Sequence, residues 1–434
     1  MRVCVVGAGG REHALAVAIA RTATVVVAPG NPGMTLLSGG DNLRCTPEQP
    51  EHVDADLWVI GPEVPLVDGL ADRLRAAGKL VLGPGADGAR LEGSKAWMKD
   101  VLVSAGVPTA AHASFEQAEP AIDYLRRLGG GPYVVKTDGL AAGKGVLVTE
   151  SRSEAIDDIR AKLSGSSFGL AGRRVVIEEG LVGDELSVMA ICDGNTAVAL
   201  APAQDFKRAG DGDTGPNTGG MGAFSPVPLA GDDLVAAVME QAVLPTLSAL
   251  RRRGIDYRGV LYAGIMLTAE GPKVLEFNVR LGDPETQVVL PRWQGDVAAV
   301  LASAASGRLA SAGQPTFDDQ AAVCVVLAAA GYPASPRLGD AISGLDRAGS
   351  MEGVQIYASG TTTAGPDGRG RLVAGGGRVL GITGLGPSLA QARNRAYAAA
   401  ACVEWTGRQY RHDIAERAAA AATAAATAGM EAGA

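Results

Sequence analysis

The segment "VLEFNVRLGDPETQ", residues 274–287, carries three regularly spaced polar side chains among apolar ones. On a β-strand, Glu276 and Asn278 would lie on one face, because side chains alternate with a period of two. Their oxygens are hard ligands of the kind that Mg²⁺ takes alongside nucleotide phosphates. Arg280 continues this face and could stabilise charge on a phosphoryl group in transfer. A solvated strand acid is the alternative for Glu276 alone, but the triplet favours a phosphoryl-transfer site.

A glycine-rich loop, "TDGLAAGKG" at residues 137–145, joins two apolar segments that we expect to be strands. Its glycines would let backbone amides approach phosphate oxygens, with Lys144 inside the loop and Lys136 just before it. It is not a Walker loop, because Gly145 and a strand follow the lysine where that motif requires Ser or Thr and a helix. Two interpretations stay open: a hairpin that closes over a triphosphate, and a hairpin that is merely flexible.

The segment "IEEGLVGDE", residues 177–185, is an apolar strand that ends in two carboxylates. An extended hinge after such a strand can offer backbone groups to the edge of an adenine. A downstream acid such as Glu185 can accept hydrogen bonds from ribose hydroxyls. The segment is therefore a candidate nucleoside site.

A glycine turn near the start of the chain, in "VCVVGAGGREHALA" at residues 3–16, predicts a strand that feeds a helix N-terminus, which attracts anions. A dinucleotide fingerprint would need a third small residue and an acid at the end of the second strand. Glu12 occupies the small position, and the second strand, within residues 24–33, ends in Pro-Gly-Asn. The backbone amides of the turn, with Arg11 beside them, instead suit a lone phosphate. A turn required only for backbone geometry is the alternative.

The N-terminal part of the chain alternates strand and helix patterns, which predicts a parallel, doubly wound sheet. Each strand is followed at once by a Gly/Pro turn, so these turns should gather at the carboxyl edge of the sheet, where such folds bind ligands. The expected strands are residues 3–6, 24–28, 57–60 and 80–82.

The rest of the chain shows two further sequence patterns. Residues 132–149 and 174–181, with a helix that opens on the capping box Ser151-x-x-Glu154, predict a small two-layer unit. Beyond it we expect strands at 186–192, 197–201, 259–268, 273–278 and 321–331, a long polar loop at 204–222, and helices at 232–253 and 387–405. The alanine-rich tail, residues 418–434, is expected to be frayed or disordered.

Length and composition limit the classes of protein. A chain of 434 residues predicts about three domains, and 47% hydrophobic with 20% charged residues indicates a folded, soluble protein. A net charge of −8 argues against a nucleic-acid surface. The five cysteines form no C-x-x-C pair, so we expect no zinc site or disulfide framework, and a reducing, cytoplasmic location. No apolar run approaches the ~18 residues of a membrane span, and we expect no signal peptide, no anchor and no membrane partner.

These motifs, in this order, resemble the ATP-grasp superfamily and, within it, the phosphoribosylamine–glycine ligase family. The resemblance runs from Met1 to about Asp413, and the polar loop at 204–226 is its most specific piece. The motifs that carry it are "GGREHA", "APGNPG", "GPEVPL", "LEGSKAWMKD", "DGLAAGKG", "QDFKRAGDGDTGPNTGGMGAFSP" and "EFNVRLGDPETQ".

The resemblance implies a reaction of purine synthesis. ATP would phosphorylate the glycine carboxylate, and the amine of 5-phosphoribosylamine would attack the glycyl phosphate, giving glycinamide ribonucleotide, ADP and phosphate. The cofactors implied are ATP and Mg²⁺, with Mn²⁺ as an alternative metal. The residues agree with this chemistry, because phosphoryl transfer needs positioning and charge neutralisation more than a protein nucleophile. We expect a monomer, with a homodimer as the alternative.

The resemblance also implies roles for individual residues. In the ATP site, Lys95 and Lys136 would hold the α and β phosphates, Gly143, Lys144 and Gly145 would close on them, Glu178, Glu179 and Leu181 would line the adenine pocket, and Glu185 would contact the ribose. Glu276 and Asn278 would hold the metal, and Arg280, Lys136 and Lys144 would act on the transferring phosphoryl group. Asp205, Lys207, Asp213, Asn217 and Gly220 would shape the glycine and amine site, and Gly10, Arg11, Asn31, Gly33 and Glu63 would meet the sugar phosphate.

The resemblance fixes the expected α/β architecture: a doubly wound N-terminal domain, an ATP-grasp domain with an inserted lid, and a small α+β C-terminal domain. The expected boundaries are 1–93, a connection at 94–109, the lid at 110–180, the ATP-grasp core at 181–318, the C-terminal domain at 319–417 and the tail at 418–434. We expect the lid to close over ATP by a hinge motion. One departure is Phe206, where the family pattern has His, so this position is not expected to transfer protons.

Three alternatives were weighed against this interpretation. A bicarbonate-activating ATP-grasp carboxylase is disfavoured because no biotin-carrier segment is present and the loop "TGPNTGGMGAFSP" favours the glycine enzyme. An NAD-linked oxidoreductase is disfavoured by Glu12 and the missing strand-end acid. A catalytically silent nucleotide-binding regulator is disfavoured by the intact Lys136, Glu276, Asn278 and Arg280.

Overall fold

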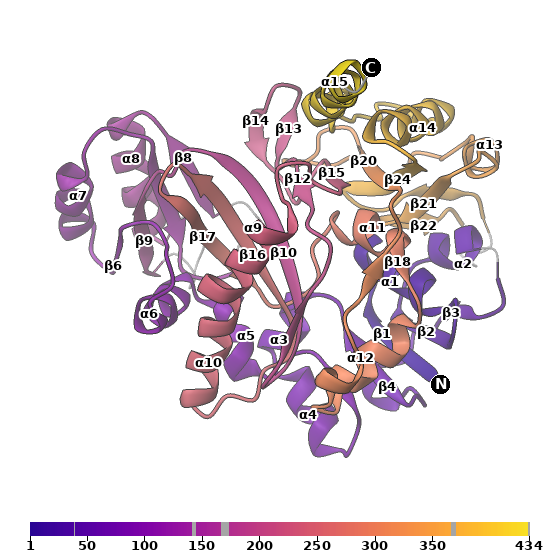
Figure 1. Ribbon diagram of the computed structural model, residues 1–434, viewed down its shortest axis with the longest axis horizontal. Coiled ribbons are helices and arrows are strands. Elements are labelled where there is room, and N and C mark those ends of the chain that lie inside the picture. The colour runs from indigo at the N-terminus through magenta and orange to yellow at the C-terminus, as the bar shows by residue number, and fades with distance from the viewer. Residues whose placement is uncertain (39, 141–144, 166–172, 366–369, 433–434) are drawn as a thin grey trace.

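The computed structural model describes residues 1–434 except 39, 141–144, 166–172, 366–369 and 433–434 (Figure 1). The predicted Gly143 and Lys144 lie outside the described residues.

The N-terminal part is a five-stranded, fully parallel sheet of order β3-β2-β1-β4-β5, which confirms the predicted doubly wound fold. β1 is central and its valines are buried, as expected for a strand covered on both faces. The strands are β1 (Arg2–Gly7), β2 (Thr24–Pro29), β3 (Leu43–Cys45), β4 (Leu57–Ile60) and β5 (Val81–Leu82), and the helices are α1 (Gly10–Ile19), α2 (Pro32–Ser38), α3 (Glu63–Val67), α4 (Leu70–Ala76) and α5 (Ala86–Gly93).

The predicted two-layer unit is a four-stranded sheet of order β6-β9-β7-β8 covered by two helices, and it lies at the left of Figure 1. Ser151 caps the second helix by accepting a hydrogen bond from the backbone of Glu154, as its capping-box sequence predicts. The elements are β6 (His112–Phe115), α7 (Ala118–Arg127), β7 (Tyr133–Thr137), β8 (Val146–Thr149), α8 (Arg152–Leu163) and β9 (Val175–Glu179).

The central layer is an antiparallel sheet of order β11-β10-β16-β17. Its strands are β10 (Asp184–Asp193), β11 (Ala197–Ala199), β16 (Arg258–Thr268) and β17 (Gly271–Asn278), and its neighbouring helices are α6 (Lys95–Ala105), α9 (Asp232–Val238) and α10 (Leu244–Arg252). A π-helical turn joins α9 to α10, so the predicted helix at 232–253 is confirmed with one irregularity. By length and composition this helical stretch could cross a membrane, but one of its faces, which includes Leu247 and Leu250, is buried in the protein core.

The polar segment after β11 is a correction to the sequence analysis, which expected a loop. It forms β12 (Gln204–Asp205), β13 (Arg208–Gly210), β14 (Thr214–Asn217) and β15 (Gly222–Ser225). We call residues 204–225 the polar hairpin. β12 and β15 belong to a five-stranded sheet of order β12-β15-β20-β24-β21, so this segment is built into the C-terminal sheet.

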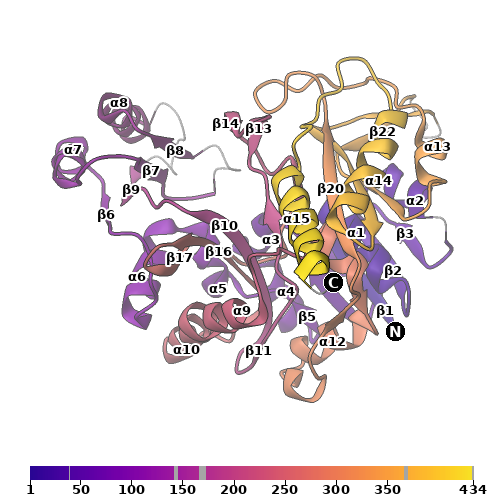
Figure 2. The ribbon, with the colours of Figure 1, turned by 45° about the horizontal axis from the view of Figure 1, so that its top comes forward.

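Short elements connect the central layer to the C-terminal sheet. They are α11 (Thr286–Val289), β18 (Trp293–Gln294), α12 (Val297–Ala305) and β19 (Thr316–Phe317). The C-terminal elements are β20 (Ala321–Ala328), α13 (Leu345–Gly349), β21 (Val354–Ala358), β22 (Thr361–Thr363), β23 (Leu372–Ala374), β24 (Arg378–Gly386), α14 (Leu389–Cys402) and α15 (Glu416–Ala432). The expected frayed tail is thus wrong: alanine has the highest helix propensity, and the tail forms α15, which lies beside α14 (Figure 2).

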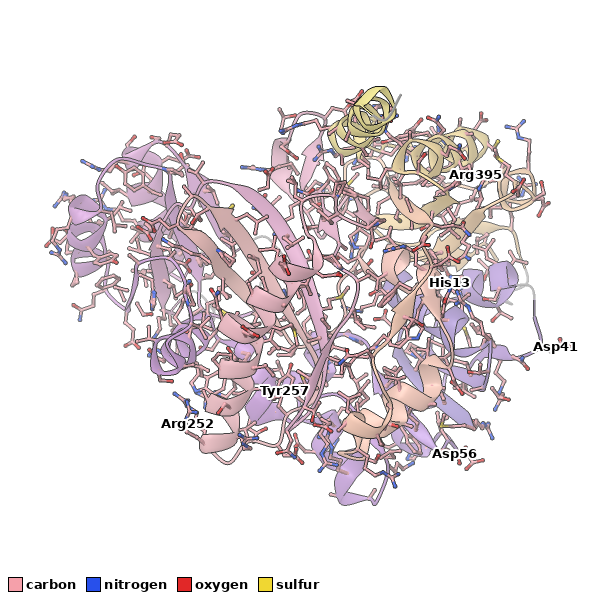
Figure 3. All side chains as sticks on the ribbon, in the orientation of Figure 1. His13, Asp41, Asp56, Arg252, Tyr257 and Arg395 are labelled. Carbon is pink, nitrogen blue, oxygen red and sulfur yellow. The ribbon has the colours of Figure 1, made fainter. Side chains whose placement is uncertain are left out.

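The N-terminal and C-terminal sheets are packed together through His13, which Figure 3 labels at this junction. The ring is fully buried, and its Nδ1 accepts a hydrogen bond of 2.8 Å from the backbone of Ala358 at the end of β21. Its Nε2 lies 2.9 Å from the Ser38 hydroxyl. Burial lowers the pKa of His13 to about 3, so the ring is neutral in the folded protein.

Candidate active site

A large cleft of about 1920 Å³ lies between the four-stranded β6-β9-β7-β8 sheet, the central sheet, the polar hairpin and the C-terminal segment that leads into α15. Most of the predicted site residues line it, although they are far apart in the sequence. These are Arg11, Glu63, Lys95, Lys136, Gly145, Glu178, Glu179, Leu181, Glu185, Asp205, Lys207, Asp213, Asn217, Glu276, Asn278 and Arg280. Gly10, Asn31, Gly33 and Gly220 are not among the lining residues.

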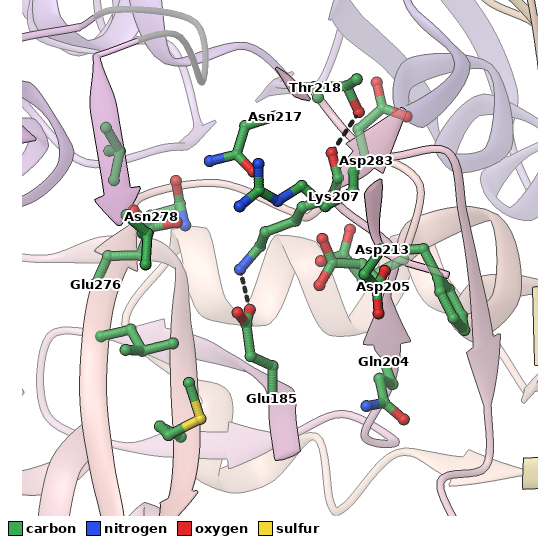
Figure 4. Close-up of a pocket in the computed structure, with 18 of the residues that line it drawn as sticks. Glu185, Gln204, Asp205, Lys207, Asp213, Asn217, Thr218, Glu276, Asn278 and Asp283 are labelled. Carbon is green, nitrogen blue, oxygen red and sulfur yellow. Dashed lines mark hydrogen bonds and ion pairs between the residues drawn. The ribbon is translucent and has the colours of Figure 1, made fainter. Parts of the chain in front are cut away.

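The predicted metal ligands lie side by side at the end of β17 and face the cleft (Figure 4). Burial opposes ionisation of Glu276, but the charges of Lys207, Lys95, Lys136 and Arg280 outweigh it and hold the pKa of this carboxyl below its usual value. Within the described part of the chain, no side chain forms a hydrogen bond or ion pair with the Glu276 carboxylate. An ionised, unpaired carboxylate beside an amide oxygen fits a hard divalent cation.

Arg280 lies next to the metal candidates and is held on two sides by acids. It forms ion pairs with Glu92 at 2.8 Å and with Glu63 at 3.3 Å, and it donates a hydrogen bond of 3.2 Å to Oδ1 of Asn278. Although burial opposes its charge, these acids raise the pKa of Arg280 above its usual value. The guanidinium is therefore a permanent, preorganised positive charge beside the metal candidates.

The phosphate side of the cleft contains a carboxylate shared by two lysines. Glu178 forms ion pairs of 2.9 Å with Lys136 and with Lys99, and all three side chains are buried. Burial raises the pKa of Glu178, but the two lysines more than offset this and hold it below its usual value. Glu178 lines the cleft, its carboxylate is engaged by the two lysines, and its predicted place in the adenine pocket stays a prediction.

The N-terminus of α6 brings Lys95 to the same side of the cleft. Ser94 caps this helix, and Oδ1 of Asp138, at the start of the glycine-rich loop, accepts hydrogen bonds from the Ser94 hydroxyl at 2.9 Å and from the Ala96 amide at 3.1 Å. Lys95 itself donates a hydrogen bond of 3.4 Å to the backbone oxygen of Gly139. The loop, the helix terminus and Lys95 are thus joined. The Ala96 and Trp97 amides of the terminus are already used by Asp138 and Ser94, so Lys95 is the cationic group that this segment presents to the cleft.

The predicted nucleoside residues lie where β9 leads into β10. Oε1 of Glu179 accepts a hydrogen bond of 3.0 Å from the Ala111 amide, and Leu181 lines the cleft. Glu185 forms an ion pair with Lys207 of the polar hairpin (Figure 4). The segment from Glu179 to Glu185 therefore contacts both the residue before β6 and the predicted glycine site.

Acidic groups surround Lys207 in the polar hairpin. Burial, together with the charges of Glu285, Glu185 and Glu276, raises the pKa of Asp205 to about 7 against the opposing charge of Lys207. Glu285 is itself buried and accepts a hydrogen bond of 2.5 Å from the Tyr262 hydroxyl. This part of the cleft is an acidic pocket around one ammonium group.

The structure explains why two other predicted residues of the polar hairpin are an aspartate and a glycine. Asp213 has a φ of +54° and accepts a hydrogen bond of 2.7 Å from Arg411, a buried residue of the C-terminal segment. Gly220 has a φ of +109°, and a Cβ there would lie 2.5 Å from Pro284, so only glycine fits. Asn217 lines the cleft at the end of β14.

The sequence analysis expected the backbone amides of the N-terminal glycine turn to be free to bind phosphate, and the structure shows one of them already bonded. Oε2 of Glu12 accepts a hydrogen bond of 2.6 Å from the Gly9 amide, so the carboxylate occupies the place expected for phosphate. Nδ2 of Asn31 donates to backbone oxygens of Ala8 and Ser359, and its Oδ1 accepts from the Gly33 amide. These polar groups are used within the fold, and a substrate role for Asn31, Gly10 and Gly33 stays a prediction. Arg11 and Glu63 face the cleft.

Five residues of the site were missed by the sequence analysis. Lys99 could have been found, since it lies four residues after Lys95 and shares its helix face. Glu92 and Glu285 lie in the motifs "LEGSKAWMKD" and "EFNVRLGDPETQ", and that placement was the signal that could have found them. Arg378 and Arg411 come from the C-terminal part, and only the folded chain brings them to Asp283 and Asp213.

Comparison with known families decides to which family the chain belongs. Models of the phosphoribosylglycinamide synthetase family match the N domain at residues 1–92, the ATP-grasp (A) domain at 93–286 and the C domain at 322–417. The chain belongs to the phosphoribosylglycinamide synthetase family. This confirms the family and the three-part architecture that the sequence predicted; the finer domain boundaries given above stay a prediction.

Relatives of this family match along nearly the whole chain. The phosphoribosylamine–glycine ligase of Rhodopirellula baltica is 44% identical over 431 residues, covering 96% of this chain and 97% of its own. That of Caulobacter vibrioides is 45% identical over 426 residues, covering 96% and 98%. As a member of this family the chain is an ATP-dependent ligase, as the sequence analysis expected.

Solved structures agree with this assignment. The crystal structure of the phosphoribosylamine–glycine ligase from Thermotoga maritima has a TM-score of 0.83 at 36% identity and covers 95% of this chain and 100% of that chain. A biotin carboxylase domain from Hydrogenobacter thermophilus has a TM-score of 0.66 at 16% identity, covering 94% and 91% of the two chains. The second likeness concerns the fold alone.

Proposed function

We propose that this protein joins glycine to 5-phosphoribosylamine at the expense of ATP, forming glycinamide ribonucleotide, ADP and phosphate. The observation that carries the proposal is the row Glu276, Asn278 and Arg280 that lines the cleft beside Lys136, in a chain that matches its ligase relatives over 96% of its length. The acid, amide and guanidinium supply what a phosphoryl transfer needs, and no nucleophilic side chain is required.

In the first step, a carboxylate oxygen of glycine attacks the γ-phosphorus of ATP. The P–O bond to ADP breaks, and glycyl phosphate forms. Lys136 and Arg280 neutralise charge on the phosphoryl oxygens as the bond order shifts, because both are held in place before the reaction by buried carboxylates. Lys95, on the helix that Ser94 caps, binds the polyphosphate from the side of the lid.

In the second step, the amine of 5-phosphoribosylamine attacks the carbonyl carbon of glycyl phosphate. The C–O bond to phosphate breaks, the C–N bond forms, and the nitrogen loses a proton. Asp205, whose pKa lies at about 7, is suited to accept a proton near neutral pH, and the acidic pocket around it suits the ammonium group of glycine. Arg11 and Glu63 would contact the phosphoribosyl group from the N-terminal side.

The residues present fit a divalent metal, which we take to be Mg²⁺ or Mn²⁺. Among the described residues no group of three or more His, Cys, Asp and Glu side chains is arranged to hold a metal by itself. Glu276 and Asn278 would therefore hold it together with phosphate oxygens of the nucleotide, as is usual for Mg²⁺. When bound, the metal supplies charge neutralisation between the phosphates.

We further infer a soluble, cytoplasmic enzyme that acts on small molecules as a monomer. The buried thiols of Cys4, Cys192 and Cys324, whose pKa values burial raises to about 12, support a reducing compartment, because such thiols are inert and unpaired.

ADP formation in a coupled assay tests the proposal. The reaction contains MgATP and freshly generated 5-phosphoribosylamine, and glycine is compared with bicarbonate and with no added acid. We expect ADP only with glycine. ADP formation that depends on bicarbonate would retain the ATP-grasp chemistry and overturn the substrate, and no ADP formation in any mixture would overturn the ligase assignment.

A further inference from the structure

A lysine that does not line the cleft lies directly behind the predicted phosphate site. Lys99 is on α6, one turn after Lys95, and its side chain is completely buried. Its Nζ donates hydrogen bonds to Oε2 of Glu178 at 2.9 Å and to the Thr109 hydroxyl at 2.7 Å. A buried ammonium group is costly unless it has a function or a well-placed partner, so its presence here needs an explanation.

The partner of Lys99 is shared with Lys136, which does line the cleft. Oε1 of Glu178 lies 2.9 Å from Nζ of Lys136, and Oε2 lies 2.9 Å from Nζ of Lys99. Lys136 also donates to the backbone oxygen of Leu275 at 3.1 Å, next to Glu276. Two ammonium groups on one carboxylate leave a net charge of +1, whereas Lys136 and Glu178 alone would sum to zero.

We propose that Lys99 is a positioning residue that shares the Glu178 carboxylate and thereby leaves the charge of Lys136 uncompensated toward the polyphosphate of ATP. The inference rests on the proposed function, since it takes the cleft to be an ATP site. The proposal requires Lys99 to be charged at neutral pH. Burial and the nearby Lys136 lower the pKa of Lys99 to about 8, but Glu178 keeps the side chain protonated at neutral pH.

Thr109 shows that Lys99 is also fixed to the strand that bears the metal candidates. The Thr109 hydroxyl donates a hydrogen bond of 2.6 Å to the backbone oxygen of Val274 on β17, and Lys99 donates to that hydroxyl. Lys99 and Lys136 are thus tied to neighbouring residues of β17, two and one positions before Glu276. The positive charges are held at a fixed distance from the carboxylate that would bind the metal.

The test compares binding of MgATP with binding of adenosine, by titration calorimetry of the full-length protein. Lys99→Met should weaken MgATP binding at least about tenfold, since removing a unit charge near a polyanion costs this much even with strong screening. Adenosine, which has no phosphate, should bind within about twofold of wild type. The double variant Lys99→Met/Glu178→Gln removes one charge of each sign, restores the net charge of +1 and should recover MgATP affinity to within about threefold.

A matched control is Lys162→Met, which also removes a buried lysine with a carboxylate partner, Asp158, but on α8 of the lid. It should lower the melting temperature and leave MgATP affinity unchanged. If Lys99→Met does not fold, Glu178→Gln alone carries the test: it removes the carboxylate that faces Lys136, so the pair keeps at least the positive charge of Lys136, and the variant should bind MgATP at least as tightly as wild type.

Three results would overturn the proposal. The first is wild-type MgATP affinity in Lys99→Met. The second is an equal loss for MgATP and adenosine without recovery in the double variant, which is what a purely structural lysine would give. The third is weaker MgATP binding in Glu178→Gln. If the wild-type protein binds no MgATP at all, the proposed function is wrong, and this inference, which rests on it, is wrong as well.

Discussion

The strand β17 and the glycine turn after β1 both suggested a ligand site from sequence, and the folded chain treats them differently. On β17, Glu276 faces the cleft, and within the described residues its carboxylate has no protein partner. At the turn, Glu12 accepts from the Gly9 amide and Asn31 spans backbone groups of two sheets. One motif presents its polar groups to a ligand, and the other uses most of them to hold the fold together.

The difference shows what a sequence motif can and cannot establish. The alternation of a strand determines which side chains share a face, so Glu276 and Asn278 had to lie together whatever the rest of the chain did. A glycine turn determines only that the backbone can approach something closely. At this turn, what it approaches first is the chain's own Glu12.

The largest expected effect is at β17. Glu276→Gln should lower kcat/KM for glycine-dependent ADP formation at least about 100-fold, because it removes the charged metal ligand while keeping the shape. The melting temperature should stay the same or rise, because within the described residues no side chain pairs with the Glu276 carboxylate and its charge is held close to other buried groups of the cleft. Steady-state kinetics at saturating Mg²⁺ and thermal unfolding check both parts.

The control for this change is Glu270→Gln, an exposed acid at the turn before β17 that pairs with Lys273. It should leave kinetics and stability near wild type. If Glu276→Gln retained wild-type kinetics, Glu276 would not be a metal ligand. The proposed difference between β17, as a ligand site, and the glycine turn, as part of the fold, would then be wrong.

At the turn the expected effect is on stability. Asn31→Ala should lower the free energy of unfolding by about 2–3 kcal/mol, since several buried backbone groups lose their partner. Denaturant unfolding measures this, with the exposed Asn42→Ala as the control. A raised KM for 5-phosphoribosylamine with unchanged stability would instead make Asn31 a substrate residue, as the sequence predicted.

His13, on the helix that follows the turn, predicts a pH dependence of stability. Its folded-state pKa of about 3 lies below the usual value near 6.5, so the unfolded chain binds the proton more readily. Stability is thus intact above pH 6.5 and falls as the pH drops toward 3, by up to about 1.4 kcal/mol per pH unit from this group. His13→Gln should flatten that slope in unfolding curves taken between pH 4 and 7, while the exposed His412→Gln should keep it. Equal slopes in wild type and His13→Gln would refute the assignment.

The smallest effect is expected at Phe206, the departure from the family pattern. The Arg411 guanidinium lies 4.9 Å from the Phe206 ring, an arrangement worth about 0.5–1 kcal/mol. Phe206→Leu should therefore cost about that much stability and leave turnover within about twofold. A tenfold loss of kcat at unchanged stability would show that the ring takes part in the reaction.

The sequence predicted the architecture well because its signals are local. Buried valines on β1, the capping box before α8 and the polar face of β17 depend on near neighbours in the chain. Arg411 could not be predicted as a partner of Asp213, because nothing local links residues about 200 positions apart. The polar hairpin was mistaken for a loop since its strands are polar and glycine-rich, and their pairing with β20 becomes visible only in the folded chain.

The helix α15 was misjudged for a different reason. Low sequence complexity suggested disorder in the tail, whereas alanine favours a helix once one end is packed, as Ile414, Ala415 and Ala419 are in the protein core. The ion pairs of Glu178 could not be predicted from its own segment, because one of them depends on Lys99 of a separate motif. The adenine role of Glu178 stays a prediction.

The central claim is that the glycine carboxylate itself receives the phosphoryl group. Glycine labelled with ¹⁸O in its carboxylate, MgATP and 5-phosphoribosylamine would be incubated with the protein, and the released phosphate would be analysed by mass spectrometry. The account predicts one ¹⁸O atom in each phosphate formed, because the carboxylate oxygen that attacks ATP leaves with the phosphorus. Phosphate without the label, formed at the rate of ADP release, would contradict it.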